Sequence, residues 1–305
     1  MLAYSDISST MPNLTSAVVI SSYNYAQFIG KTIESVLRQS HPPDEVIVVD
    51  DGSTDESPRI IESFGPAVKL IVQTNQGVCA ARNNGAREST SDVIAFMDSD
   101  DLWRANKLEL QIAEFERDGD VGLVSCGIRY FDEKDNTLVV YDKGMSGWRA
   151  REILLYREPV LNTTASAIAI RRKVFNEIGG FDETRELFSA EDREFCYRAA
   201  VASKIAFIPE VLVDYRIHGS NGHLDIARMD KALRVAYAKI FSSADSDILG
   251  IRRESYGNLF TNLAGSHFRA GNFYRFAVNS IKSIVLTPSS IRHFISFPLR
   301  KLKRE

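Results

Sequence analysis

The sequence predicts an α/β fold, in which a mostly parallel sheet carries helices on both faces and a helical C-terminal extension follows. Up to Glu114, short apolar runs alternate with segments whose apolar residues recur at helical spacing. The runs are apolar on both faces, which is typical of strands in a parallel sheet that helices cover from both sides. From Ile226 onward the chain has only helical patterns.

Four strands with intervening helices are expected in the first part of the chain. The strands are expected at residues 17–20, 45–49, 68–72 and 93–97. Ile29, Ile33 and Val36 are spaced as on one face of a helix, so a helix is expected between the first two strands. Similar spacing predicts helices around residues 60–64, 77–87 and 108–115. Strands that alternate with helices in this way indicate a parallel sheet.

The pattern is less regular beyond Glu114. Strands are expected at 121–126, 165–170 and 205–208, with helices at 173–178 and 190–202. Further helices are expected at 230–241, 248–269 and 272–285, interrupted by Gly271 and ended by Pro288. The chain is therefore expected to divide into an N-terminal extension (1–15), an α/β domain (16–221) and a helical C-terminal region (222–305).

Composition narrows the class of protein. The formal net charge of -3 provides no argument for a nucleic-acid partner, and three widely spaced cysteines are typical of free thiols in a reducing compartment. The N-terminus lacks a signal-peptide pattern, and no window reaches the roughly 18–20 apolar residues that span a bilayer. A cytoplasmic protein is expected. Its basic and apolar tail, 291–305, predicts peripheral contact with the inner membrane face.

Three carboxylates follow the fourth strand directly, at Asp98, Asp100 and Asp101. Like charges so close together disfavour joint ionisation, so a cation is expected among them. Carboxylate oxygens suit Mg²⁺ or Mn²⁺, and sparse protein ligation leaves room for a diphosphate on the same ion. Ligands of parallel sheets bind beyond the carboxyl ends of the strands. The loops 21–24, 50–55 and 98–101 are therefore expected to meet at one edge of the sheet.

Five motifs, in this order along residues 16–221, resemble the family 2 inverting glycosyltransferases of the GT-A fold. They are the run from Val18 to Asn24, the run from Val48 to Asp55, Ala81-Arg82-Asn83-Asn84-Gly85, Asp98-Ser99-Asp100-Asp101, and Gly179-Gly180-Phe181-Asp182-Glu183 with Glu191-Asp192. The resemblance implies that Ser21, Tyr23 and Asp51 hold the nucleotide. It also implies that Asp98 and Glu191 contact the donor.

The resemblance also assigns the metal and the catalytic base. Asp100 matches the second acid of the family's Asp-x-Asp motif and is implied to bind Mn²⁺ or Mg²⁺, with His218 as a further ligand. Asp192 matches the general base. A carboxylate in that role takes the proton of the acceptor hydroxyl as it attacks the anomeric carbon. A single displacement of this kind inverts the anomeric centre.

The expected function is transfer of a sugar from a nucleoside-diphosphate donor, with UDP as the expected nucleotide, to a hydroxyl acceptor. The acceptor is expected to be a sugar or a lipid-linked sugar in polysaccharide or glycolipid assembly. One alternative is a sugar-nucleotide pyrophosphorylase, although the loop after the first strand lacks the Gly-rich basic character that a triphosphate needs. Another alternative is a scaffold that binds nucleotide sugars without turnover.

Several of these residues also have purely structural interpretations. Asp50 is expected to brace its loop, and Arg82 and Asn83 to anchor a helix end rather than touch substrate. Glu191 and Asp192 fall in the first turn of an expected helix, where acids also serve as caps. The structure distinguishes between these interpretations.

Overall fold

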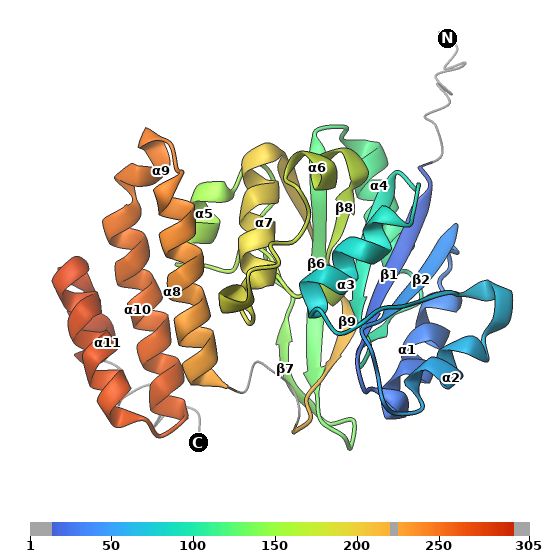
Figure 1. Cartoon of the computed structure of the whole chain (residues 1–305). Helices are drawn as coiled ribbons and strands as arrows, with labels where there is room; N and C mark the ends of the chain where they lie inside the picture. The colour runs from blue at the N-terminus through green and yellow to red at the C-terminus, as the bar shows by residue number, and fades with distance from the viewer. Residues whose placement is uncertain (1–13, 220–224, 296–305) are drawn as a thin grey trace, which may run out of the picture.

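The computed structural model describes residues 14–219 and 225–295, and it confirms the predicted fold class (Figure 1). The described strands form one sheet in the order β3-β2-β1-β4-β8-β6-β9-β5, with β7 paired to β6. Its first part consists of the four predicted strands, all parallel: β1 (Ser16–Ser22), β2 (Glu45–Asp50), β3 (Lys69–Val72) and β4 (Val93–Asp98).

Both faces of β1, β2 and β4 are buried under helices, as their apolar sequences predicted, whereas the edge strand β3 stays partly exposed. The helices are α1 (Ala26–Leu37), α2 (Ser57–Glu62), α3 (Val78–Arg87), α4 (Lys107–Arg117), α6 (Arg172–Glu177) and α7 (Glu191–Ala202). Along β1, Val18 and Ile20 share one apolar cluster with residues of α1 and α4. Val19, between them, belongs to the cluster that includes residues of α3 and α7. Successive side chains thus supply two cores, one on each face.

The sheet becomes mixed beyond β4. Antiparallel β8 (Ala169–Arg171) joins β4 to β6 (Val121–Phe131), and β9 (Lys204–Arg216) runs parallel to β6. The two other antiparallel strands are β5 (Leu102–Trp103) on β9 and β7 (Thr137–Tyr141) on β6. The single strand expected at 165–170 is wrong, because Ala165–Ala167 is a 3₁₀ turn and the strand begins only at Ala169. β7 and α5 (Ala150–Leu155) lie where the sequence predicted no element.

The C-terminal region is helical, as predicted, and it packs on the sheet domain. Its elements are α8 (Ile226–Ser242), α9 (Ser246–Gly250), α10 (Arg252–Arg269), α11 (Phe273–Leu286) and α12 (Ile291–Ile295). The helix expected at 248–269 is two helices that meet at Ile251. Leu233 and Tyr237 of α8 and Leu259 of α10 belong to the same apolar cluster as Leu154 of α5 and Phe195 of α7. A continuous core therefore joins the two regions.

The outermost helix is α11, at the edge of the molecule farthest from the sheet (Figure 1). Among the residues that the structure describes, no helix combines the length and the apolar character needed to cross a membrane. The predicted domain boundary at 221/222, most of the predicted extension 1–15 and most of the basic tail fall outside the described residues.

Candidate active site

A pocket of about 1090 Å³ opens beyond the carboxyl ends of β1, β2 and β4. The strand register explains why the predicted residues meet there: Ser21 lies beside Asp98, and Ser22 lies beside Asp50. Seven of the eight predicted site residues line this pocket, namely Ser21, Tyr23, Asp51, Asp98, Asp100, Glu191 and Asp192. The eighth, His218, contacts Asp100. The volume lies at the upper end of typical ligand pockets, so it has room for more than one small molecule.

Two neighbouring acids at the end of β2 have different surroundings. Asp50 accepts hydrogen bonds from the amide and the hydroxyl of Ser53, at 2.8 and 2.6 Å, so it braces its own loop. Asp51 accepts from Gln73 Nε2 at 2.8 Å, from the Gln76 amide at 2.9 Å and from the Gly77 amide at 2.8 Å. A carboxylate has about four acceptor positions, so these three bonds leave Asp51 capacity for a ligand hydroxyl.

The three carboxylates at the end of β4 and just beyond it do not converge on one point. Asp98 pairs with Arg82, Asp100 lies against His218, and Asp101 accepts a hydrogen bond from the Arg216 amide at 3.0 Å. Burial raises the pKa of Asp101 well above its ordinary value, and its neighbours Asp100 and Asp98 raise it further. The expectation of one cation shared by all three acids is therefore wrong. Protein groups provide a separate partner for each acid.

The two predicted metal ligands, however, lie together. Asp100 Oδ2 and His218 Nε2 are 2.8 Å apart, and both side chains are largely buried. The His218 ring packs against Phe28, with ring centroids 4.9 Å apart, and this contact holds it toward Asp100. Within residues 14–219 and 225–295, no group of three or more His, Cys, Asp or Glu side chains could hold a metal ion. Asp100 and His218 therefore fit an ion such as Mn²⁺ or Mg²⁺ only if diphosphate and water oxygens complete its coordination.

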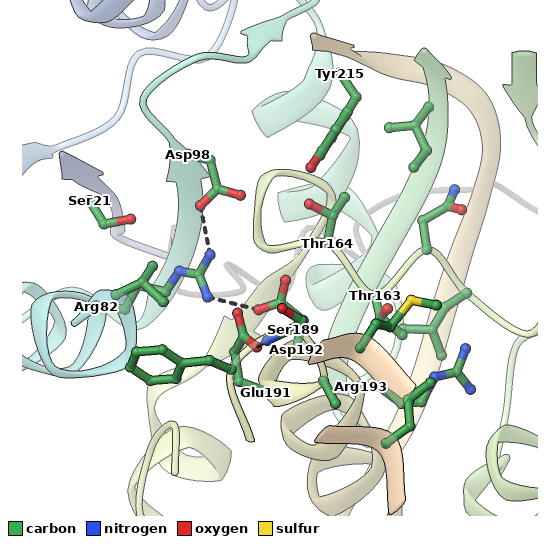
Figure 2. A pocket seen from close by; sticks show the side chains of 18 of the residues that line it. Ser21, Arg82, Asp98, Thr163, Thr164, Ser189, Glu191, Asp192, Arg193 and Tyr215 are labelled. Carbon is green, nitrogen blue, oxygen red and sulfur yellow. Dashed lines mark hydrogen bonds and ion pairs between the residues drawn. The ribbon is translucent and has the colours of Figure 1, made fainter. Parts of the chain in front are cut away.

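Arg82 connects Asp98 to Asp192, the predicted base (Figure 2). Its side chain is only 3% exposed, and it donates from Nη2 to Asp98 Oδ1 at 2.6 Å and from Nη1 to Asp192 Oδ1 at 2.8 Å. The expectation that Arg82 only anchors a helix end is therefore wrong, because it lies inside α3 and lines the pocket. The sequence did contain a signal for this pairing, because Arg82 is a long charged side chain among the small residues of this helix. A charge that is buried in such a place needs a partner of opposite charge.

Asp192 is held by tertiary contacts and not by helix capping. It falls in the first turn of α7, but no side chain caps that helix, and Asp192 Oδ2 instead accepts from the Ala165 amide at 3.2 Å. Burial raises the pKa of Asp192, Arg82 lowers it, and Glu191 and Asp98 raise it again, to about 7. The side chain remains 21% exposed, toward the pocket. An accessible carboxylate with a pKa near neutrality has the properties of a general base.

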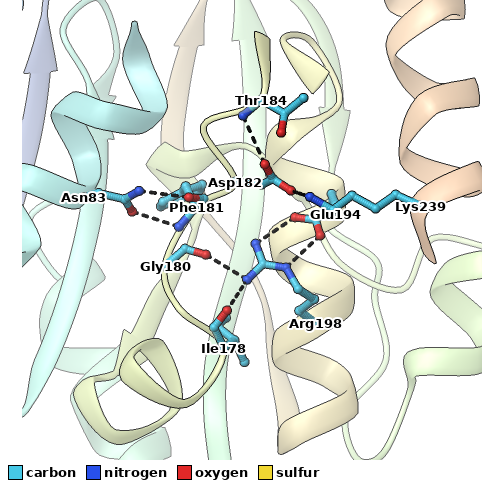
Figure 3. Close-up of polar contacts among 9 residues, drawn as sticks. All are labelled: Asn83, Ile178, Gly180, Phe181, Asp182, Thr184, Glu194, Arg198 and Lys239. Carbon is cyan, nitrogen blue, oxygen red and sulfur yellow. Dashed lines mark hydrogen bonds and ion pairs between the residues drawn. The ribbon is translucent and has the colours of Figure 1, made fainter. Parts of the chain in front are cut away.

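The structure fixes the position of α3 relative to α7 through Asn83, the residue after Arg82 (Figure 3). Asn83 donates to the Phe181 carbonyl and accepts from the Phe181 amide, both at 2.8 Å. Gly180 approaches so closely that a Cβ atom there would lie 2.6 Å from Asn83 Oδ1. On the other side, Arg198 of α7 donates to the Gly180 carbonyl at 2.8 Å. Asn83 is therefore structural, as expected, and it helps to hold Arg82 beside Asp192.

The far wall of the pocket contains residues that the sequence did not single out. Ser21 and Asp98 lie on one side of Asp192, and Thr163 and Arg193 lie on the other (Figure 2). The Arg193 guanidinium stacks 3.8 Å from the ring centroid of Tyr156. The C-terminal helices complete this wall with Arg228, Met229, Leu233 and Asn262. Long-range packing assembles this half of the pocket, which no local motif could indicate.

Comparisons with known proteins identify the family of this chain. Residues 17–179, just over half of the chain, match the model of glycosyl transferase family 2. An uncharacterized glycosyltransferase of Nostoc sp. is 35% identical over 218 residues, which cover 69% of this chain and 67% of that protein. A putative teichuronic acid biosynthesis glycosyltransferase of Bacillus subtilis is 32% identical over 158 residues, 50% of this chain and 60% of that protein. The chain thus matches about two thirds of the length of such relatives.

Solved structures share the fold at low sequence identity. S. aureus TarS 1–349 in complex with UDP-GlcNAc has a TM-score of 0.61 at 16% identity, covering 92% of both chains. A mannosyltransferase of Pyrobaculum calidifontis in complex with GDP-Man and Mn²⁺ also has a TM-score of 0.61, at 20% identity, covering 96% of this chain and 84% of that one. Such likeness shows the GT-A type fold. With the family match and the Nostoc relative, it establishes that this chain belongs to glycosyl transferase family 2.

Proposed function

We propose that this glycosyltransferase moves a sugar from a nucleoside-diphosphate donor, with UDP as the expected nucleotide, to a hydroxyl acceptor with inversion at the anomeric carbon. One observation carries the proposal: Arg82 joins Asp98, on the donor side of a single pocket, to Asp192, a carboxylate whose pKa is near 7. This arrangement sets the distance between a bound donor and the base that would activate an acceptor.

The donor side is assigned to the edge formed by β1, β2 and β4. Ser21, Tyr23 and Asp51 would hold the nucleotide there, and Asp98 and Glu191 would contact the donor sugar or ribose. Asp100 and His218 would hold Mn²⁺ or Mg²⁺ together with the diphosphate. A bound cation would offset the negative charge that develops on the leaving nucleotide. TarS was solved in complex with UDP-GlcNAc and the mannosyltransferase with GDP-Man and Mn²⁺, which supports a nucleotide-sugar donor and a divalent cation.

Asp192 would take the proton from the acceptor hydroxyl. It faces the pocket, and the Arg82 guanidinium and the Ala165 amide orient its two oxygens. Glu191 is assigned to contact with the donor instead, and its Oε2 accepts a hydrogen bond from the Ser189 amide. Attack on the anomeric carbon from the Asp192 side, opposite to the leaving diphosphate, is a single displacement and inverts the configuration.

The acceptor would occupy the far half of the pocket, between Arg193 and the C-terminal helices. The Bacillus subtilis relative is named for teichuronic acid biosynthesis, and this name supports a role in polysaccharide or glycolipid assembly. A sugar or a lipid-linked sugar is the expected acceptor. The proposal keeps the division of the chain into residues 1–15, 16–221 and 222–305. It also includes a peripheral location at the inner membrane face.

The test is nucleotide release from a panel of UDP- and GDP-sugars, with Mn²⁺, with Mg²⁺ and with chelator. We expect one nucleotide sugar to be turned over only with a divalent cation. Proton NMR of the product should show the anomeric configuration opposite to that of the donor, and retention would refute the single displacement. Pyrophosphate release from a nucleoside triphosphate and a sugar phosphate would instead indicate the pyrophosphorylase. Calorimetric binding of nucleotide sugars without turnover would indicate the inactive scaffold.

A further inference from the structure

Helix α11 has its apolar face turned outward. Asn279 and Ser283 are its two fully buried residues, and both are polar. Asn279 accepts from Arg234 Nη2 at 2.7 Å, and the Ser283 hydroxyl lies 2.6 Å from that of Thr261 on α10. A surface helix of a globular protein ordinarily turns its apolar stripe toward the core. The outward face of α11 therefore needs an explanation beyond the fold of this chain.

The exposed residues form one continuous surface, the α11 stripe, made up of Tyr274, Ala277, Ile281 and Val285. They are three or four positions apart, so they lie along a single face of the helix. Tyr274 is 76%, Ile281 62% and Val285 65% exposed. Ile291 and Ile295 of α12 add exposed apolar side chains just after it. Scattered exposed apolar residues are common, but a full-length stripe of them indicates a binding surface.

The charged residues of α11 and of the chain that follows it, up to residue 304, are all basic. The whole chain has 37 Lys and Arg against 40 Asp and Glu, yet residues 255–304 contain eight Lys and Arg and no acid. Two of these basic residues, Arg275 and Lys282, lie on α11 itself. Apolar side chains flanked by basic residues are the composition of helices that lie in the interface of an anionic bilayer. At 14 residues, α11 is shorter than the roughly 20 that a spanning helix needs.

We propose that the α11 stripe binds the surface of an anionic lipid bilayer, with the helix lying in the plane of the headgroups. A second copy of the chain fits this surface less well. In a symmetric contact the same patch meets itself, so Arg275 and Lys282 would approach their own equivalents. Asp230 Oδ2 lies 3.8 Å from Arg275 Nη1, but its side chain is only 2% exposed and so cannot reach across to a second copy. Anionic headgroups provide the opposite charge, and their acyl boundary accepts Ile281 and Val285.

Helix α10 links this surface to the pocket. Asn262 lines the pocket, whereas its neighbour Thr261 contacts Ser283 of α11. The proposed membrane surface and the proposed acceptor wall therefore lie on two sides of one helix. The lipid binding refines the peripheral location included in the proposed function, and this link to the acceptor wall rests on that proposed function as well. It would suit an acceptor that is anchored in the bilayer.

The experiment is flotation of the full-length chain with vesicles of phosphatidylcholine alone and with about one quarter phosphatidylglycerol. We expect flotation with the anionic vesicles at low salt and little with neutral ones. Changing Ile281→Ser together with Val285→Ser should lower the bound fraction about tenfold. Val201→Ser is the matched control, because Val201 on α7 is 53% exposed and lies outside the stripe. Arg275→Gln with Lys282→Gln should weaken binding and reduce its dependence on salt.

Two further measurements distinguish lipid binding by the α11 stripe from lipid binding by the C-terminal tail and from dimerisation. If deleting residues 296–305 abolishes flotation and the Ile281/Val285 variant floats like the wild type, the tail binds lipid and the α11 assignment is wrong. If light scattering shows a dimer that the same variant dissociates, the stripe binds a second copy instead. Melting curves should show that the variants fold. Nucleotide-sugar turnover is measured in parallel without vesicles, so a failure of the proposed function would not be mistaken for a failure of lipid binding.

Discussion

Replacing Arg82 with methionine should shift the pH dependence of turnover to higher pH. Methionine keeps the apolar stem of the side chain and removes the cation that lies between Asp98 and Asp192. In this variant, burial and the charges of Asp98 and Glu191 still raise the pKa of Asp192. The Arg82 charge that lowers this pKa is gone, so the pKa should rise. Asp192 acts as a base only when it is deprotonated. Activity is therefore present above its pKa and falls as the pH drops through it.

The size of the shift follows from the geometry. Arg82 Nη1 and Asp192 Oδ1 are 2.8 Å apart, which places the charge centres about 4 Å apart. Unit charges at that distance interact by roughly 4 kcal/mol at an effective dielectric of about 20, and one pKa unit corresponds to about 1.4 kcal/mol. Because Asp192 is 21% exposed to the pocket, solvent screens part of this. We expect the midpoint to rise from about 7 to about 8–9.

The assay is kcat/KM for nucleotide-sugar turnover across a pH series, with thermal melting of each variant at the same pH values. Arg82→Lys is the control, since it keeps the charge and loses the two-pronged geometry. It should keep a midpoint near that of the wild type, with a lower maximum rate. A folded Arg82→Met enzyme with an unchanged midpoint would refute the coupling between Arg82 and Asp192.

Other variants test the base, the metal ligands and the core. Asp192→Asn should bind the nucleotide sugar in calorimetry with unchanged affinity and lose about 10²-fold or more in kcat, and an equal loss of binding would indicate a structural role. Asp100→Asn and His218→Ala should each raise the Mn²⁺ concentration needed for half-maximal turnover, and unchanged metal dependence would contradict their assignment as ligands. Lys107, fully buried beside Gln111, has a pKa lowered by burial from 10.5 to about 7. The unfolded chain therefore binds more protons between those values, and this group makes the free energy of unfolding rise with pH there. Lys107→Met should increase that free energy by about 1–4 kcal/mol near pH 6 and remove the rise, as urea denaturation at several pH values would show.

The local sequence predicted the structure correctly where a feature depended on a single strand, helix or loop. The apolar run of β1 was correctly predicted to be a strand, because strand formation there depends on neighbouring residues. Ser21, near the end of this strand, and Tyr23, just after it, line the pocket. The expectation for Asp50 was also correct, because this residue braces its own loop through Ser53. Local pattern failed at residues 165–170, where the backbone turns once before β8 begins. An apolar run does not reveal such a turn, because buried turns and strands share their composition.

The sequence by itself determined that the first four strands are parallel, and hence that Ser21, Asp51 and Asp98 meet at one edge. Apolar residues on both strand faces require helices on both sides, and the carboxyl ends of parallel strands lie together. Only the tertiary structure decided that Arg82 pairs with Asp98 and Asp192, because a buried cation does not specify its partners. Likewise, the pairing of β9 with β6 carries His218 to Asp100 across 118 positions of the chain. Only the tertiary structure, too, showed that the α11 stripe faces outward. Amphipathic spacing shows that a helix has an apolar face, but packing decides what covers that face.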